Sequence, residues 1–255
     1  MWPLFFLLSR AASICLAGTP SPEELAGILK AIDDRQTHIG DQKSLVFIDR
    51  QERDKSELIY QAVVYRRDAD DKLVILFLKP DSEAGKGYLR IDANLFIYDP
   101  QVGKWERRTE REHIGGTDSL RSDYDQSRLA EEYTATYVGE ETLGSYTAHH
   151  LKLAGKPGVD VPWPTLELWT DTAAGNLLKR QDFAESGRLM RTTYYRDWRK
   201  VYSDAKKADI YYPHEVLLKD EIEVGNVTRV VIQQVDLSPL DDSIFTKAWL
   251  ESRSR

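Results

Sequence analysis

The sequence has little of what disulfides, metal sites and clusters require. Its 255 residues include one cysteine, Cys15, and five histidines. One thiol excludes an intramolecular disulfide, a zinc site built from several cysteines and an iron–sulfur cluster held by the chain. His149 and His150 are adjacent, so on a strand they point to opposite faces and do not chelate one ion together. We therefore expect no metal and no cofactor.

The motifs of common enzyme classes are also missing. The chain contains no His-Glu-x-x-His, no Gly-x-Ser-x-Gly and no Gly-x-x-x-x-Gly-Lys-[Ser/Thr]. Carboxylate pairs occur at 123/125, 140/141 and 241/242, in segments that read as turns or loops, where solvated side chains explain them better than a catalytic pair. We expect a protein that is not an enzyme, with a hydrolase that uses Asp or Glu as the alternative.

Positive charge is in deficit. The chain carries 35 Lys and Arg against 42 Asp and Glu, a formal net charge of −7. An acidic chain has no general attraction for phosphate backbones, so nucleic acid is not an expected partner. With 30% charged residues and a mean hydropathy of −0.50, the composition is typical of a soluble globular protein.

Long hydrophobic runs are absent, and the longest apolar block lies at the N-terminus. This block ends before Arg10, whereas a spanning helix needs about 20 apolar residues. With small residues at Cys15, Ala17 and Gly18, it resembles a secretory signal. We predict a signal at 1–18 and a single domain at 19–255, with a lipid anchor at Cys15 or a retained segment as alternatives. Cleavage removes the only thiol, which suits an oxidising exported compartment.

One helix is clearly indicated after the N-terminal segment. Ser21 is a good N-cap, Pro22 suits the first helical position, and acidic residues follow in the first turn. Four apolar residues then recur at helical spacing over about 13 residues: Leu25, Ile28, Leu29 and Ile32. Two further short helices are expected at 126–132 and at the C-terminus.

The remainder reads as short strands joined by hairpin-length turns. Aromatic residues, 13 Tyr, 7 Phe and 6 Trp, favour such a pleated surface. We expect about eleven antiparallel strands in a mainly β, α+β fold, forming a curved sheet or half-open barrel whose opening the helices cover. That estimate of about eleven comes from thirteen segments that read as strands: 45–48, 58–65, 73–78, 87–91, 95–98, one from 105, 133–141, 145–153, 165–171, 176–184, 187–199, 211–222 and 226–236.

Two of these strands are apolar on both faces. Neither 73–78 nor 95–98 shows the alternation of a sheet with one solvated face, so both of their faces must be covered. One cover could be the N-terminal helix, and the other a second element or an apolar ligand. An ordinary two-sided core explains the pattern equally well.

Four segments resemble the LolA-like outer-membrane lipoprotein-sorting proteins. Residues 85–100 read GKGYLRIDANLFIYDP, and YRDWR at 195–199, YPHEV at 212–216 and IFT at 244–246 follow in the family's order. The resemblance runs from about Leu45 to Leu250. It implies an incomplete barrel of about eleven antiparallel strands whose apolar interior holds acyl chains.

The resemblance also implies site residues. An arginine after the second strand helps to hold the lid and the cargo in the family, and the matching position is Arg67, with Arg66 as the alternative. The loop at 115–118 resembles a Gly-Ser/Thr-Asp segment of the family, but Ser119 follows where the family has an aromatic residue. This loop lies in the one long irregular stretch, 112–132, and stretches of that length are often functional lids. For the cavity wall we predict residues of the two-sided strands: Leu73, Ile75, Phe77, Phe96 and Tyr98.

We therefore expect a carrier of lipids or lipoproteins in the periplasm, either free or associated with a membrane. Its partners would be acyl chains and a protein of the inner or outer membrane. The alternative on the same fold is a lipid-sensing regulator or accessory protein of a membrane transporter.

Overall fold

The computed structural model describes residues 19–36, 40–53, 58–91, 94–108, 113–115, 117, 119–124 and 127–254. The predicted signal at 1–18 lies outside these residues, as do Gly116 and Asp118 of the predicted loop. No helix in the described part of the chain is long and apolar enough to cross a bilayer.

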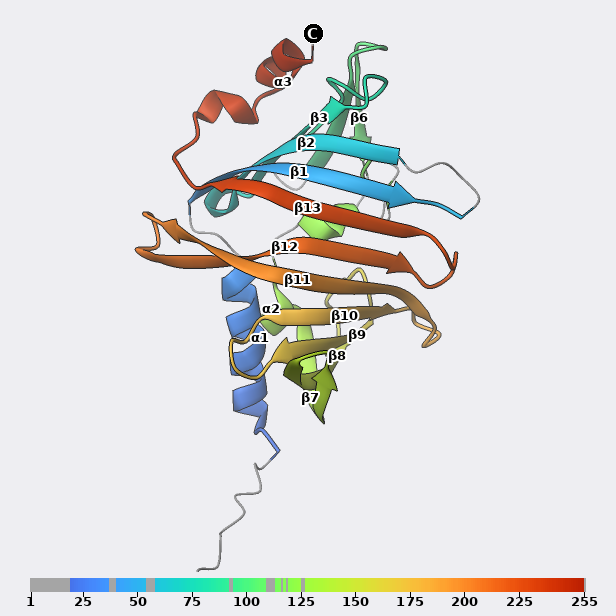
Figure 1. Cartoon of the computed structure of the whole chain (residues 1–255), viewed down its shortest axis with the longest axis vertical. Coiled ribbons are helices and arrows are strands. Elements are labelled where there is room, and N and C mark those ends of the chain that lie inside the picture. The colour runs from blue at the N-terminus through green and yellow to red at the C-terminus, as the bar shows by residue number, and fades with distance from the viewer. Residues whose placement is uncertain are drawn as a thin grey trace, which may run out of the picture.

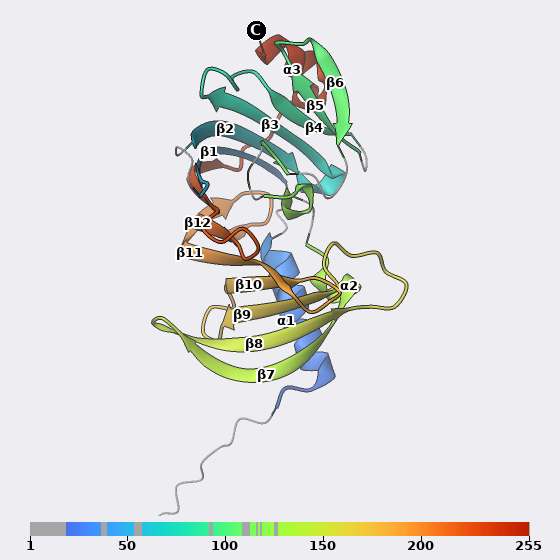
Figure 2. The ribbon, with the colours of Figure 1, turned by 90° about the vertical axis from the view of Figure 1, so that its right-hand side faces the viewer.

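A single antiparallel sheet of thirteen strands dominates the described residues, in the order β6-β5-β4-β3-β2-β1-β13-β12-β11-β10-β9-β8-β7. The sheet is strongly curved but not closed, because β6 and β7 are free edges (Figures 1 and 2). The predicted open antiparallel sheet is thus confirmed, and the predicted count of about eleven strands was too low. The strands are β1 Asp41–Gln51, β2 Leu58–Arg67, β3 Lys72–Lys79, β4 Gly87–Ile91, β5 Asn94–Asp99, β6 Lys104–Arg108, β7 Tyr133–Leu143, β8 Tyr146–Gly155, β9 Thr165–Asp171, β10 Leu177–Phe183, β11 Leu189–Ser203, β12 Ala208–Asp220 and β13 Val227–Asp236.

The strand order places β6 and β7 at opposite edges of the sheet, so the connection between them must cross it. Strands β1 to β6 run outward to one edge, and β7 to β13 return from the opposite edge until β13 pairs with β1. The chain crosses from one edge to the other between β6 and β7. This crossing contains η2 (Arg121–Tyr124) and α2 (Leu129–Glu132), and η1 (Asp68–Asp70) is a separate turn between β2 and β3.

Helix α1 (Pro22–Gln36) begins as the sequence predicts. Its first turn is a capping box: the backbone N–H of Ser21 donates to Glu24 Oε2 at 2.7 Å, and that of Glu24 donates to Ser21 Oγ at 3.3 Å. The buried stripe of α1 packs with α2 against the inner face of β7 to β10, so the sheet curls around both helices (Figure 2). Asp33 of α1 caps α2 by accepting from the backbone N–H groups of Leu129 and Ala130, both at 2.9 Å.

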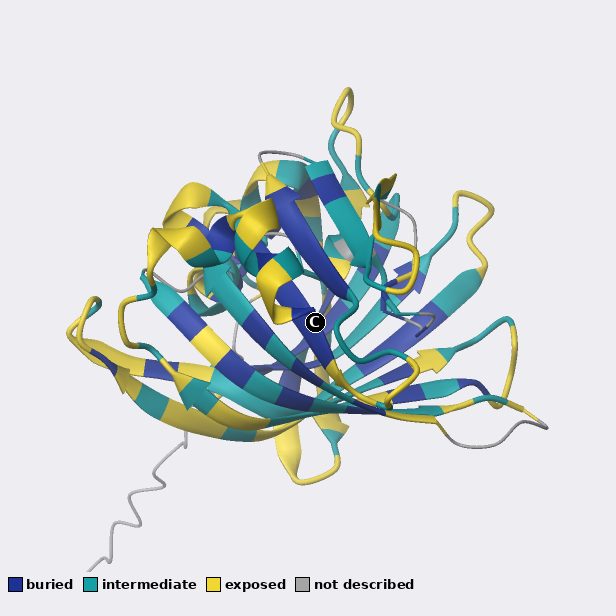
Figure 3. Cartoon of the chain, turned by 90° about the horizontal axis from the view of Figure 1, so that it is seen from above, coloured by how far each residue is buried: buried dark blue, intermediate teal, exposed yellow. Residues whose placement is uncertain are grey.

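The two-sided strand β3 is covered on both faces, but α1 is not one of its covers. Its outward residues Val74 and Leu76 pack under the C-terminal segment, which comprises η3 (Asp242–Phe245) and α3 (Lys247–Arg253). Its inward residues belong to a second apolar cluster on the concave face. Along β1 and β2 buried residues alternate with more exposed ones, as expected when successive side chains point to opposite faces, and Figure 3 shows how burial is distributed over the sheet.

We predict that the C-terminal helix is an integral part of the core. Leu250 is fully buried, so Leu250→Ala should lower the free energy of unfolding by about 2–5 kcal/mol in urea denaturation. The control is Val102→Ala at a position that is 62% exposed, which should change stability by less than about 0.5 kcal/mol. Equal effects of the two substitutions would contradict this assignment.

Candidate functional site

A cavity of 570 Å³ lies on the concave face of the sheet, beside α1 and α2. Its size falls within the range of about 300–1,000 Å³ that is usual for small-molecule sites. One part of its wall is apolar and comes from strands β1, β2, β3 and β13 and from the crossing segment: Val46, Ile48, Val64, Ile75, Phe77, Ile114, Val230 and Ile232.

Phe77 is the central aromatic ring of this apolar wall. It makes edge-on contacts with Tyr60, with ring centroids 5.6 Å apart, and with Tyr88, at 6.2 Å. Such geometry brings the positive edge of one ring to the negative face of the next. The three rings are at most 4% exposed, so Tyr60 and Tyr88 form a buried aromatic cluster that supports Phe77.

The structure divides the predicted wall residues between two faces. Ile75 and Phe77 line the cavity, and Leu73 belongs to the same inner cluster. Phe96 and Tyr98 lie on the outer face, where Lys247 Nζ is 4.7 Å from the Phe96 ring centroid and Tyr98 packs in the cluster of α3. In β5 the inward positions are Leu95 and Ile97, because successive residues of a strand point to opposite faces.

The two arginines at the end of β2 are divided in the same way. Arg66 lines the cavity and pairs with Asp68, with Nη2 at 2.8 Å from Oδ1. Arg67 holds the C-terminal segment: its Nε donates to Asp41 Oδ1 at 2.6 Å, its Nη2 donates to the Leu240 carbonyl at 2.5 Å, and it also pairs with Asp242. The hydrogen bond from Arg67 lowers the pKa of Asp41.

The crossing segment closes the cavity over Phe77. The backbone N–H of Gly115 donates to the Tyr88 hydroxyl at 2.9 Å, and Gly115 has φ +60°, a left-handed conformation that favours glycine. A Cβ at this position would lie 2.8 Å from Phe77 Cζ. Thr117 fixes the turn by donating from Oγ1 to the Ile114 carbonyl at 2.7 Å.

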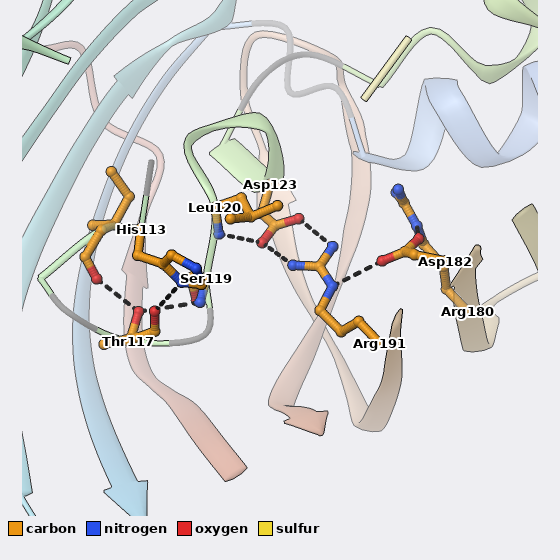
Figure 4. Close-up of polar contacts among 9 residues, drawn as sticks. His113, Thr117, Ser119, Leu120, Asp123, Arg180, Asp182 and Arg191 are labelled. Atoms are coloured by element: carbon orange, nitrogen blue, oxygen red, sulfur yellow. Dashed lines mark hydrogen bonds and ion pairs between the residues drawn. The ribbon is translucent and has the colours of Figure 1, made fainter. Parts of the chain in front are cut away.

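An ionic network, buried at Asp182 and Arg191 and more exposed at Asp123, ties the same segment to the other half of the sheet (Figure 4). Arg191 of β11 donates from both terminal nitrogens to Asp123, at 2.6 and 2.7 Å, and from Nε to Asp182 of β10 at 2.8 Å. Arg180 completes the network by donating from Nε to the second oxygen of Asp182 at 2.6 Å. Asp182 is fully buried and Arg191 is 6% exposed. Burial raises the pKa of Asp182, but the two guanidinium groups outweigh it and hold this pKa below its ordinary value.

This network was missed from the sequence, although it carried a signal. Arg180 and Asp182 stand two residues apart and share one face of β10, and Asp182 lies directly opposite Arg191 in the β10–β11 register. Three charged residues at inward positions are costly unless they are paired. The pairing of these charges can be recognised only when the strand register and the inward face of each strand are known.

Comparisons with known proteins agree with this architecture. A family model described as an uncharacterized protein matches residues 69–252. The chain is similar to a LolA superfamily protein from Nitrosomonas europaea, with 20% identity over 88% of this chain and 97% of that one and a TM-score of 0.71. A candidate outer-membrane lipoprotein-sorting domain from Vibrio parahaemolyticus has 17% identity over 91% and 100%, with a TM-score of 0.75. A DUF1329 family protein from Desulfovibrio piger has 17% identity over 90% and 98%, with a TM-score of 0.77. At these identities the similarity shows the fold. No curated protein matches the sequence.

We predict that Asp182→Asn destabilises the protein strongly at neutral pH. The substitution leaves two guanidinium groups facing a neutral amide, and breaking such a buried pair costs about 3–5 kcal/mol. The folded-state pKa of Asp182 is below the ordinary 3.8, so its ionised form stabilises the fold above pH ~3.8 and this contribution is lost as the pH falls through the folded-state pKa. Urea unfolding at several pH values should show the gap between wild type and variant narrowing in acid. A gap independent of pH would refute this role.

Gly115→Ala should displace the crossing segment from Phe77. Gly144 has a nearly identical φ of +64° but nothing within 4 Å of an added Cβ, so Gly144→Ala is a matched control for the backbone cost alone. We expect Gly115→Ala to lower the free energy of unfolding by about 1–3 kcal/mol more than the control, because of overpacking. Equal losses in thermal or urea unfolding would show that Phe77 yields without cost.

Proposed function

We propose that this chain, which belongs to the family whose model matches residues 69–252 and shares the fold of LolA-like lipoprotein-sorting proteins, is a periplasmic carrier of lipids or lipoproteins. It shields acyl chains from water in the cavity on the concave face of its sheet. Export of the chain and a protein partner in the inner or outer membrane are parts of the same proposal.

The observation that carries the proposal is the apolar wall of the cavity around Phe77. Exposing an acyl chain to water costs about 0.8 kcal/mol per CH₂, so a chain of roughly 16 carbons has a transfer cost near 12 kcal/mol. A preformed apolar wall lowers this cost during transit through water. Release then requires only a receptor that binds the cargo more tightly.

The proposed wall consists of the inward residues of β1, β2, β3 and β13. Leu73, Ile75 and Phe77 remain in this set, whereas Phe96, Tyr98 and Arg67 lie on the outer face and serve the C-terminal segment. At the end of β2, Arg66 is the arginine with access to cargo. No bond is made or broken during carriage, so the proposed function needs no catalytic group.

Co-purification provides the first test of the carrier function. The protein would be isolated from a membrane fraction and extracted for mass spectrometry, and binding of a fluorescent fatty acid would be titrated in parallel. We expect a bound lipid in the extract and saturable binding of the fluorescent ligand. Absence of both would refute the carrier function.

We further predict that the two faces of β13 respond differently to one substitution. Ile232 lines the cavity, whereas its half-buried neighbour Val231 points to the opposite face. Ile232→Gln places an amide against the hydrocarbon at a cost of about 1–3 kcal/mol and should weaken fatty-acid binding by about tenfold. Val231→Gln should leave the affinity unchanged, and the same loss from both variants would place the ligand elsewhere.

A further inference from the structure

The cavity has a second, polar end that an acyl chain alone does not explain. This end lies beside α1, α2, β11 and β12. Burial raises the pKa of Tyr195 to about 12, so this tyrosine is neutral and able to donate a hydrogen bond at neutral pH. The polar and aromatic residues that line this end are Arg35, Ser127, Arg128, Tyr195, Trp198, Tyr211 and Tyr212.

Arg35 is held at this end by neutral groups. Its Nη1 donates to the Asn176 side-chain oxygen at 2.8 Å, and its guanidinium carbon lies 5.2 Å from the centroid of the Tyr211 ring. Among the described residues, no carboxylate forms an ion pair with Arg35. Its position in the last turn of α1 favours a cation through the helix dipole. Of the residues that the structure describes, only Asn176 accepts a hydrogen bond from the guanidinium group, which has five N–H donors.

The other arginines of the lining differ from Arg35. Arg66 is neutralised by Asp68, and Arg180 by Asp182. Arg128 is exposed at the start of α2 and, within the described part of the chain, has no ion-pair partner. Two carboxylates also line the cavity without an ion pair to a described residue: Asp160, and Glu132, whose pKa burial raises.

We propose that the cavity binds an anionic amphiphile, with the carboxylate or phosphate of its head group at Arg35 and its hydrocarbon chain along the wall around Phe77. A planar guanidinium that is oriented by neutral partners offers parallel N–H donors to such a group. The two ends of one cavity thereby match the two ends of one ligand. This inference rests on the proposed function, because it assigns a head group to the same cargo site.

Three ligands with the same 16-carbon chain test the inference: palmitate, hexadecyl phosphate and neutral hexadecanol. Their affinities would be measured by displacement of a neutral fluorescent lipid from wild type, Arg35→Gln and the control Arg188→Gln. Arg188 is exposed and does not line the cavity. We expect Arg35→Gln to weaken palmitate, hexadecyl phosphate or both by about tenfold and to leave hexadecanol unchanged, and the ligand that loses affinity identifies the head group. Arg188→Gln should change nothing.

Two further measurements distinguish the charge of Arg35 from its planar geometry, and binding of a whole lipid from binding of its head group alone. Arg35→Lys keeps the charge without the planar fork, so it should recover part of the lost affinity. Inorganic phosphate alone should not displace the fluorescent lipid at millimolar concentration, because it lacks the chain; displacement would identify a site for free phosphate instead.

Each remaining outcome is decisive. Unchanged anion affinity in Arg35→Gln would overturn the inference while leaving the carrier function intact. Loss of hexadecanol binding in the same variant would also overturn it, because Arg35 would then only support the fold. A wild type that binds none of the three ligands would refute the carrier function itself.

Discussion

The need to keep both faces of one open, curved sheet away from water governs this structure. Strand β3 carries apolar side chains on both sides, so neither of its faces can be left bare. The C-terminal segment covers the outer face through Phe245 and Leu250, and the crossing segment covers the inner face through Ile114. Helices α1 and α2 cover the inner face of the other half. The inner covers do not fill the concavity, and the cavity is what remains between them.

The buried ionic network is the second element of this arrangement. In the crossing segment, Gly115 lies against Phe77 and Asp123 is bound to Arg191, so the described part of this segment joins the two halves of the sheet across the concave face (Figure 4). An isolated buried charge is prohibitive, but Arg191 is shared by two carboxylates and Asp182 by two guanidinium groups. Hydrogen bonds between charged groups are directional, so this network fixes the orientation of the crossing segment as well as stabilising it. Apolar contacts alone do not fix an orientation in this way.

The same logic explains how the cavity acquires two chemically different ends. Near β1 to β3 the lining is mostly aliphatic and aromatic, and its one arginine, Arg66, is paired with Asp68, whereas near α1 and β12 it contains Arg35, which neutral partners orient. A molecule that satisfies both ends must itself be amphiphilic. The proposed carrier function and the proposed anionic head group therefore rest on the same cavity, and separate experiments test them.

Much of the secondary structure of this protein could be predicted from the sequence, because it depends on interactions between near neighbours in the chain. The capping box at Ser21 and the apolar spacing after it located α1, and turns between alternating segments located the strands, because caps, turns and periodicity act between near neighbours. Tertiary structure alone decided which face of each strand is inward. A shift of one residue along a strand exchanges its inward and outward side chains. Phe77 therefore lines the cavity whereas Phe96 lies on the outer face, and Arg66 faces inward whereas Arg67 holds the C-terminal segment. The network of Asp123, Asp182 and Arg191 likewise depends on pairing between residues up to 68 positions apart, and such distant contacts exist only once the sheet has curled.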